Sequence, residues 1–375
     1  MAGVSRLHWG LVVCLAAAVA CSSSSDNDSG DGDGDGGGGS DVTTGGDGGD
    51  ASTGDGNAST GDGGCTPVDG KGVFSASNAW MRDVSCDPVD PNSKTITDAM
   101  VAAGGWGPGA TKFQIDMSLV VLHADAQTPM KPFTQAQGYG LPDCDVFSML
   151  PLPAVGNIEG VAGYTCGVAN SDCHLLIDYP PSHTLYEIYQ ATDNGNGGIV
   201  GGCGVLWDTS KTYPDNLRGD QCTSADAAGF PMSAMLPDAD EVFSGAVTHA
   251  IRFALPNAEI EKGVYVHPAS HAGGPSGGPN LPPYGVRMRL RPDYPVGSLS
   301  SMGAQVLARA LQKYGMFLSD GGNIPLMVQA DTYTTHKWTD VNLDSHSLFG
   351  IAPSDFQVVD LGPTVPLTYN CIRNP

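Results

Sequence analysis

The sequence has few basic residues. It contains 17 Lys and Arg among 375 residues, against 40 Asp and Glu, which gives a formal net charge of −23. A protein that binds the phosphates of nucleic acid needs a basic surface, so this balance argues against a nucleic-acid partner. Long hydrophobic runs are also lacking. The apolar run from Leu11 to Ala20 is too short to span a bilayer as a helix.

Several motifs of known chemistry are missing as well. There is no G-x-S-x-G elbow, no P-loop and no H-E-x-x-H sequence, which argues against serine hydrolases of the elbow type, nucleotide-dependent enzymes and zinc proteases. No two cysteines have the C-x2-C or C-x4-C spacing of a structural zinc site. We therefore expect neither a cofactor nor a bound metal.

The N-terminus has the features of an export signal. Arg6 precedes the apolar run, and residues 1–20 are predicted to be a cleaved signal peptide. Residues 18–21, Ala-Val-Ala-Cys, resemble a bacterial lipobox, in which the cysteine becomes the lipidated first residue. The resemblance implies a lipid anchor at Cys21, and Ser22 resembles the residue after the cysteine in outer-membrane lipoproteins. We expect a chain held in a membrane of the cell envelope, at the outer membrane or cell surface; the alternative is a secreted protein cleaved near Ala20.

The segment after Cys21 has a composition that excludes a folded core. Residues 22–64 include 16 Gly and 10 Asp and no Lys or Arg, so they bury too little surface to offset the entropy of ordering them. We predict a disordered linker over residues 21–64 and one globular domain over residues 65–375. The domain has 30 Asp and Glu against 16 Lys and Arg, a charge of −14.

The cysteines agree with export. Eight remain after Cys14 and Cys21 are set aside, an even number that predicts up to four disulfide bonds in an oxidising compartment. Eight cysteines allow 105 connectivities, and their spacing does not choose among them.

The domain has the apolar pattern of a β-protein. Apolar residues recur mostly with period two and are often interrupted by Gly and Pro, which predicts an antiparallel sandwich or jelly roll that is mainly β, with one or two short helices. The strongest helix covers residues 301–314 and ends before Gly315; weaker ones cover residues 95–103 and 224–228. Strands are predicted at residues 113–123, 174–178, 184–190, 204–208, 246–255, 263–267, 285–291, 316–319, 326–330 and 356–361.

Five segments together resemble a known family. They are Thr-Ser-Ala-Asp-Ala-Ala-Gly-Phe-Pro (223–231), Val-Thr-His-Ala-Ile-Arg-Phe (247–253), Tyr-Val-His-Pro-Ala-Ser-His (265–271), residues 281–290 and residues 310–316. In this order they resemble a broad family of uncharacterised secreted bacterial proteins. The resemblance implies export but no particular activity.

Polar residues on the predicted hairpin form the first candidate site. Asp172, His174 and Asp178 share one face of the first strand, and Glu187 lies mid-strand in its partner. Asp208 follows Trp207 in another strand. A glycosidase needs two carboxyl groups, one protonated and one ionised, beside an aromatic platform for the sugar. The alternative is ordinary polar residues on a solvated sheet face.

The remaining candidates are histidines, arginines and one aspartate. His249 shares the apolar face of its strand, either as a hydrogen-bonded core histidine or at the floor of a cleft. His267 and His271 are spaced H-x3-H and are interpreted as loop residues lining a cleft, with a metal pair as the alternative. Arg287, Arg289 and Arg291 share one strand face and match an anionic glycan or internal acidic partners.

Two hypotheses follow. The first is an envelope enzyme that cleaves a cell-wall or extracellular polysaccharide through two carboxyl groups among Asp172, Asp178, Glu187, Asp208 and Asp320, with His174 and His249 orienting them. A lyase variant would use a His or Tyr base and the three arginines. The second hypothesis is a non-catalytic surface lipoprotein that binds glycan or protein. The oligomeric state is not predicted.

Overall fold

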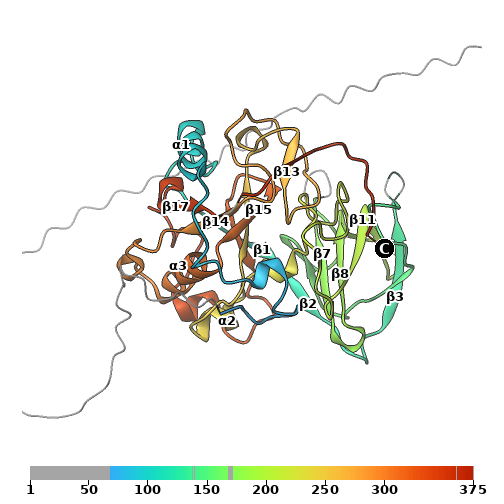
Figure 1. The fold of residues 1–375 in the computed structure, drawn as a ribbon. Helices are drawn as coiled ribbons and strands as arrows, with labels where there is room; N and C mark the ends of the chain where they lie inside the picture. The colour runs from blue at the N-terminus through green and yellow to red at the C-terminus, as the bar shows by residue number, and fades with distance from the viewer. Residues whose placement is uncertain (1–67, 137, 139, 168–171, 360, 375) are drawn as a thin grey trace, which may run out of the picture. The chain divides into compact units, whose positions relative to one another are not determined.

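The computed structural model describes residues 68–374, with the exception of 137, 139, 168–171 and 360 (Figure 1). The predicted signal peptide, the lipidation site Cys21 and the predicted linker therefore lie outside the described residues. The described residues belong to one structural unit. None of the helices in this part of the chain is both long and apolar enough to cross a membrane.

A six-stranded mixed sheet forms one half of the domain. Its strands run in the order β1 (Ile115–Leu119), β16 (Leu326–Gln329), β12 (Ile251–Leu255), β15 (Met316–Gly321), β14 (Arg287–Leu290) and β17 (Phe356–Val358). The pairs β1–β16 and β12–β15 are parallel, and the other pairs are antiparallel. Strand β12 is buried along its whole length, because it lies in the middle of the sheet with both faces covered.

Three helices pack beside this sheet. Helix α1 (Ser93–Ala103) contacts β17, helix α3 (Met302–Lys313) contacts β14, and the short helix α2 (Ala239–Phe243) contacts α3. Helix α3 begins where the Ser301 hydroxyl accepts a hydrogen bond from Ala304 N, and it ends before Gly315, whose φ of +68° suits glycine. In Figure 1 the helices lie on the left and strands β7, β8 and β11 on the right, with β1 and β15 between them.

Two four-stranded sheets form the other half as a sandwich. One has the order β11 (Cys203–Asp208), β8 (Thr184–Tyr189), β7 (Leu175–Tyr179) and β2 (Val121–His123). The other has the order β4 (Met149–Pro151), β3 (Met130–Gln135), β10 (Ile199–Gly201) and β9 (Thr192–Asp193). Leu175, Ile177 and Ile188 of the first pack against Phe133, Leu150 and Ile199 of the second in one apolar cluster.

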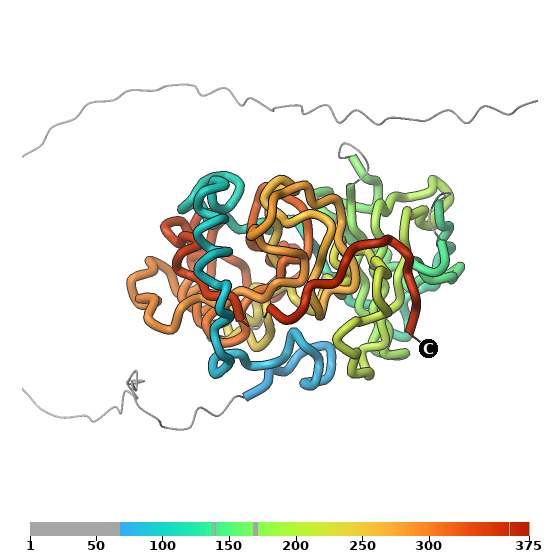
Figure 2. Tube along the Cα trace, turned by 45° about the horizontal axis from the view of Figure 1, so that its top comes forward, coloured from blue at the N-terminus to red at the C-terminus, as the bar shows by residue number. Residues whose placement is uncertain are grey.

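Short elements complete the described fold. Strands β13 (Val264–Val266) and β18 (Thr364–Pro366) form a two-stranded sheet, as do β5 (Asn157–Ile158) and β6 (Val161–Ala162). Short 3-10 helices occur at Ala79–Met81, Pro180–Ser182, Ser233–Met235, Asn257–Glu259, Val296–Ser298, Trp338–Val341 and Pro353–Asp355. Figure 2 shows the C-terminal segment, in red, running alongside the green strands of the sandwich.

The chain changes sheets at two points that matter for the site. Strand β1 of the six-stranded sheet is separated from β2 of the sandwich by Val120 alone, and β10 is separated from β11 by Gly202 alone. The six-stranded sheet and the β11–β8–β7–β2 sheet are therefore joined covalently at β1–β2. Side chains of Leu119, Val121, Leu176, Ala254 and Met327 fill the space between them.

The predicted mainly β class is confirmed, together with the helices predicted at residues 301–314 and 95–103 and the hairpin of β7 and β8. The sheets are mixed, because parallel pairs occur beside the predicted antiparallel ones. The predicted helix at residues 224–228 is wrong. This segment is a turn, because the Asp226 side chain accepts hydrogen bonds from backbone N–H groups at residues 228 and 230 and so closes a loop.

Three disulfide bonds join described cysteines: Cys144–Cys203, Cys166–Cys173 and Cys222–Cys371. Cys86 is disulfide-bonded as well. The prediction of disulfides is thus confirmed, and the last of the three fastens the C-terminal segment to the loop before Thr223.

Candidate functional site

A cavity of about 530 Å³ opens between the six-stranded sheet and the β11–β8–β7–β2 sheet. Its wall includes Arg252 from β12, Asp320 from β15, His174 at the start of β7 and the loop of residues 223–227. Five carboxyl groups and two cations line it, namely Asp116, Glu159, Asp172, Asp226, Asp320, His174 and Arg252. Most of the ionisable side chains brought together here lie far apart in the sequence.

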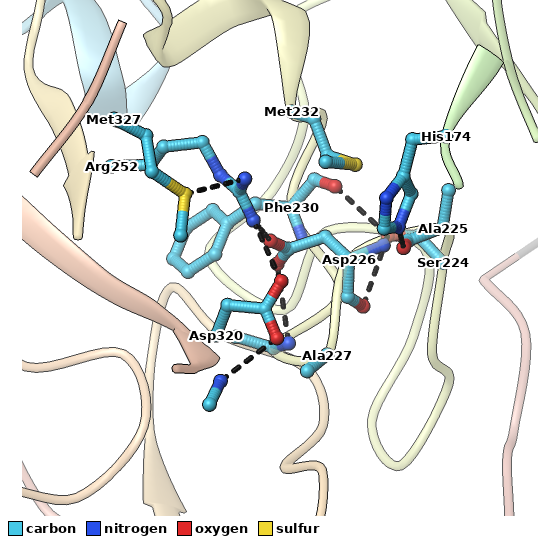
Figure 3. Close-up of polar contacts among 12 residues, drawn as sticks. His174, Ser224, Ala225, Asp226, Ala227, Phe230, Met232, Arg252, Asp320 and Met327 are labelled. Carbon is cyan, nitrogen blue, oxygen red and sulfur yellow. Dashed lines mark hydrogen bonds and ion pairs between the residues drawn. The ribbon is translucent and has the colours of Figure 1, made fainter. Parts of the chain in front are cut away.

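Arg252 holds two of these carboxylates. Its Nη2 donates to Asp226 Oδ1 at 2.7 Å and to Asp320 Oδ2 at 3.0 Å (Figure 3). Because Asp226 Oδ1 and Asp320 Oδ2 accept from the same nitrogen, the distance between these two oxygens is at most the sum of the two hydrogen-bond distances. Arg252 is completely buried, and its Nη1 contacts only the sulfur of Met327, at 2.8 Å.

Asp226 is a buried carboxyl group surrounded by hydrogen-bond donors. Its Oδ2 accepts hydrogen bonds from Ala228 N and Phe230 N, both at 3.1 Å, and its Oδ1 accepts from Arg252. Burial raises the pKa of Asp226 and the neighbouring Asp320 charge adds to this rise, whereas Arg252 and the backbone donors oppose it. All three partners are donors, so the hydrogen bonds favour the ionised carboxylate. We assign Asp226 to holding the loop and Arg252 in place.

Asp320 differs from Asp226 in its exposure. Its side chain is 26% exposed, and it lies where a β-bulge interrupts the pairing of β15 with β12. Asp320 Oδ1 accepts from Gly321 N at 2.8 Å, and Oδ2 accepts from Arg252. Both partners are donors, and they fix the orientation of this carboxylate at the cavity wall.

His174 is a buried cation on the opposite wall. Its Nδ1 lies 2.5 Å from Glu159 Oε2, and its Nε2 lies 3.1 Å from the carbonyl oxygen of Ala225. Both partners are acceptors, so both ring nitrogens carry a proton. Although burial lowers the pKa of His174, the Glu159 carboxylate outweighs it and raises the pKa to about 9. The same pair lowers the pKa of Glu159, against the effect of its burial.

Asp172 has another environment. The residue is exposed, and its side chain makes no hydrogen bond with another described residue. Partial burial of the carboxyl group raises its pKa, and the charges of Glu159 and Asp320 add to that rise, while His174 opposes it. The cavity therefore contains a carboxyl group that is more easily protonated than usual, together with Asp320, whose two oxygens each accept a hydrogen bond.

Glu187 and Trp207 lie outside this cavity, in the core. Glu187 is fully buried and accepts hydrogen bonds from Trp207 Nε1, Met232 N, Ser233 N and Ser233 Oγ, at 2.8–3.1 Å. Burial raises the pKa of Glu187, and these donors oppose the rise. Trp207 is fully buried too, so its ring has no exposed face on which a sugar could stack.

Three further predicted residues also lie away from the cavity. Asp178 faces His123 of β2, with Oδ2 at 3.5 Å from the ring Nδ1, and Asp208 accepts hydrogen bonds from Ser210 in the turn after β11. His249 is buried between the Ala250 carbonyl oxygen at 2.7 Å and Glu241 Oε2 at 3.4 Å. Of the two interpretations of His249, this geometry fits the buried, hydrogen-bonded core histidine rather than a histidine at the floor of a cleft.

The two loop histidines have separate partners. His267 Nε2 lies 2.8 Å from Asp220 Oδ1, and His271 Nδ1 lies 2.9 Å from the Ala227 carbonyl oxygen. Among residues 68–374, as far as they are described, no three His, Cys, Asp or Glu side chains are grouped to hold a metal ion.

The arginine stripe, which consists of Arg287, Arg289 and Arg291, lies away from the cavity as well. Arg287 and Arg289 are buried and donate mainly to backbone carbonyl groups. Arg291 forms an exposed ion pair with Asp293, with Nη2 at 2.7 Å from Oδ2. None of the three lines the cavity between the sheets.

Three important residues were not among the candidates from sequence. Asp226 and Arg252 lie inside two of the segments that carry the family resemblance, so those motifs contained the signal. Glu159 follows the two-residue strand β5, which is too short to show a periodic pattern. The structure thus brings three of the sequence candidates, Asp172, His174 and Asp320, into one cavity and adds these three residues.

Comparison with known proteins adds no relative. No family model matches the chain, and neither the curated proteins nor the solved structures that were searched contain a match.

Proposed function

We propose that this chain is a glycoside hydrolase with its active site in the cavity between the sheets, where Asp172 is the general acid and Asp320 is the nucleophile or base. One observation carries the proposal. Among the five carboxylates considered from sequence, these two line the same cavity. The pKa of Asp172 is raised there, whereas Asp320 accepts hydrogen bonds from Arg252 and from Gly321 N. That division of roles is what hydrolysis of a glycosidic bond requires.

Asp172 suits the acid role because its pKa is raised and its side chain is exposed. In the reaction it would give a proton to the glycosidic oxygen as the bond to the anomeric carbon breaks. Asp320 suits the second role because Arg252 and Gly321 N donate to it and fix its orientation at the cavity wall. The carboxylate would attack the anomeric carbon or accept a proton from an attacking water.

The cations at the cavity support this division without touching the sugar. Arg252 fixes Asp320 through Nη2 and is itself fixed by Asp226. His174 is held by Glu159 and Ala225 O, and its positive charge limits the rise in the pKa of Asp172. We describe Arg252, Asp226, His174 and Glu159 as positioning residues.

Arg287, Arg289 and Arg291 do not line the cavity, and the two cations that do, Arg252 and His174, are already bound to acidic groups of the chain, which favours hydrolysis over a lyase that neutralises a uronate. The proposal is therefore hydrolysis of a cell-wall or extracellular polysaccharide. The surface location follows from the N-terminal resemblance to lipoproteins, with a lipid at Cys21. It is supported by the disulfide bonds, which form and persist in oxidising compartments.

Asp172→Asn and Asp320→Asn test the proposal. The full chain would be assayed on a panel of neutral and acidic polysaccharides for new reducing ends. We expect each variant to lose at least about 100-fold in turnover while its thermal unfolding stays close to that of the unmodified protein. Asp208→Asn, which changes an exposed carboxylate outside the cavity, is the matched control and should retain activity.

A non-catalytic glycan binder is the alternative that this experiment separates. Binding without turnover on every polysaccharide would refute the enzyme. Full activity in folded Asp172→Asn or Asp320→Asn would refute the assignment of these two residues.

A further inference from the structure

Two buried arginines of β14 lack a carboxylate partner. Arg287, which is 6% exposed, donates from Nε and Nη2 to the carbonyl oxygen of Tyr314, from Nη1 to that of Ala79 and from Nη2 to that of Arg82, at 2.5–3.0 Å. Its guanidinium also lies over the ring of Phe317, 4.8 Å from the centroid. These contacts satisfy most of its N–H groups but do not neutralise its charge.

This arrangement differs from the other buried arginines. Arg218 and Arg252 each contact an aspartate at 3.0 Å or less, whereas no described carboxylate lies within ion-pair distance of Arg287 or Arg289. A charge buried without a counter-charge is costly. Burial and the positive charge of Arg82 lower the pKa of Arg287 to about 9, as expected for a buried guanidinium that has no carboxylate at ion-pair distance.

The nearest acidic groups are already engaged. Asp83 accepts hydrogen bonds from Ser85 and Val68 N, and its Oδ2 lies 3.7 Å from Lys313 Nζ. Asp87 Oδ2 lies 2.8 Å from Arg82 Nη2. The negative charges of Asp83 and Asp87 oppose the lowering of the Arg287 pKa, but neither carboxylate forms an ion pair with the Arg287 guanidinium.

Arg287 lines a second cavity, of about 510 Å³, separate from the first. Arg82, whose side chain is 51% exposed, lines it as well, as does His267. Nη1 of Arg287 uses only one of its two hydrogens in a described bond. Two carboxylates, Asp69 and Asp215, also line this cavity. Asp69 Oδ1 accepts from Asp83 N, and Asp215 is exposed.

We infer that this second cavity binds an oxyanion group, such as the carboxylate of an acidic sugar, which supplies the counter-charge that Arg287 lacks. Arg82 would contribute a second guanidinium from the cavity wall. Guanidinium groups bind carboxylate and sulfate oxygens through charge-assisted hydrogen bonds. The site is independent of the proposed hydrolase, because none of its ionisable residues belongs to the first cavity.

Arg287→Met is the obvious variant, but it would remove the Arg287 hydrogen bonds from three carbonyl groups and endanger folding. Arg82→Gln is the better test, since only its exposed ion pair with Asp87 is lost. Sodium glucuronate, sodium sulfate and neutral glucose would be titrated into the full chain by calorimetry. We expect the two anions to bind, more weakly as salt rises, and glucose not to bind.

Single substitutions test which residues of the second cavity bind glucuronate. Arg82→Gln should weaken glucuronate binding about tenfold, and Arg82→Lys should recover part of the loss. Arg291→Gln, a surface arginine outside this cavity, should bind as the unmodified chain does. Asp215→Asn should tighten binding, because it removes a like charge from the cavity wall. A merely structural role for these residues predicts no such gain.

Asp172→Asn and Asp320→Asn should bind glucuronate normally whether or not the chain is a hydrolase. The inference is overturned if neither anion binds, if glucose binds as well as glucuronate does, or if Arg82→Gln leaves the affinity unchanged.

Discussion

The buried pair of His174 and Glu159 should make the folded protein lose stability as the pH rises. The pKa of His174 is raised from 6.5 to about 9 in the folded protein. A raised pKa means that the folded state binds the proton more tightly than the unfolded state does. The resulting stabilisation is fully present below about pH 6.5 and is lost as the pH rises through about 9. One pKa unit is worth about 1.4 kcal/mol, so the effect is about 3 kcal/mol, with little screening because the side chain is 8% exposed.

The measurement is urea unfolding of the unmodified chain and of His174→Gln at several values between about pH 6 and about pH 10, with disulfides intact. His123 and His249 also have raised pKa values. Their contributions cancel in the difference between the two proteins. We expect the unmodified chain to be more stable than the variant, by an amount that shrinks by about 3 kcal/mol from the low to the high end of this range.

Two further variants sharpen the test. Glu159→Gln removes the carboxylate that raises the pKa of His174 and leaves the burial that lowers it, so the loss of stability between about pH 6.5 and about pH 9 should disappear in this variant. His183→Asn changes an exposed histidine in the hairpin turn, where the positive φ of 52° suits asparagine, and should leave the profile unchanged. A difference between the unmodified chain and His174→Gln that does not vary with pH would refute the reasoning, because the pKa of His174 would then be the same in the folded and unfolded states.

Other predictions follow from the same contacts. Glu187→Gln should lower the free energy of unfolding by about 2–4 kcal/mol, measured by urea denaturation, because a side-chain amide cannot accept from all four donors around Glu187. Replacing Cys166 and Cys173 by serine should cost about 2 kcal/mol and should also reduce turnover below the unfolding temperature, because Asp172 and His174 flank Cys173. Unchanged turnover would show that the bridge does not position them. Cys21→Ser should move the chain from the membrane fraction to the soluble fraction, which cell fractionation measures; a variant that stays with the membrane would exclude the lipid anchor.

Sequence periodicity predicted elements well but could not say which of them become neighbours. The alternation of His174, Leu176 and Asp178 correctly placed them on one face, since residues 176 and 178 pair with Glu187 and Leu185 of β8. Of these three residues only His174 lines the cavity. It lies directly before β7, at the edge of the sheet where β8 ends and β11 begins. Asp178 lies at the other end, against His123. A residue's position along β7 therefore determines whether it lines the cavity. The alternation of side chains predicts the face of the sheet but not which end of the strand lies at the cavity.

Arg252 shows the second limit. Period-two alternation over the predicted strand 246–255 placed His249 and Arg252 on opposite faces, but β12 begins only at Ile251, so His249 precedes the strand. Strand β12 is central and buried on both faces, so the polar face also packs against protein. A charged residue on such a face needs partners from other elements, here Asp226 and Asp320. The sequence contained all three residues but not the sheet order that brings them together.

The disulfide bonds lie where regular structure ends. Each of the three described bonds has one cysteine in the cavity wall or next to a residue in it: Cys173 lies between Asp172 and His174, Cys203 lines the cavity, and Cys222 precedes Thr223. The 223–227 loop and the segment before β7 lack the ladder of hydrogen bonds that fixes a strand. Covalent links next to them restrict the motion of the residues that hold Asp172, His174 and Asp226, and a reaction that depends on two carboxyl groups at a fixed separation requires that restriction. An oxidising compartment would then be a condition for the geometry of the site as well as for stability.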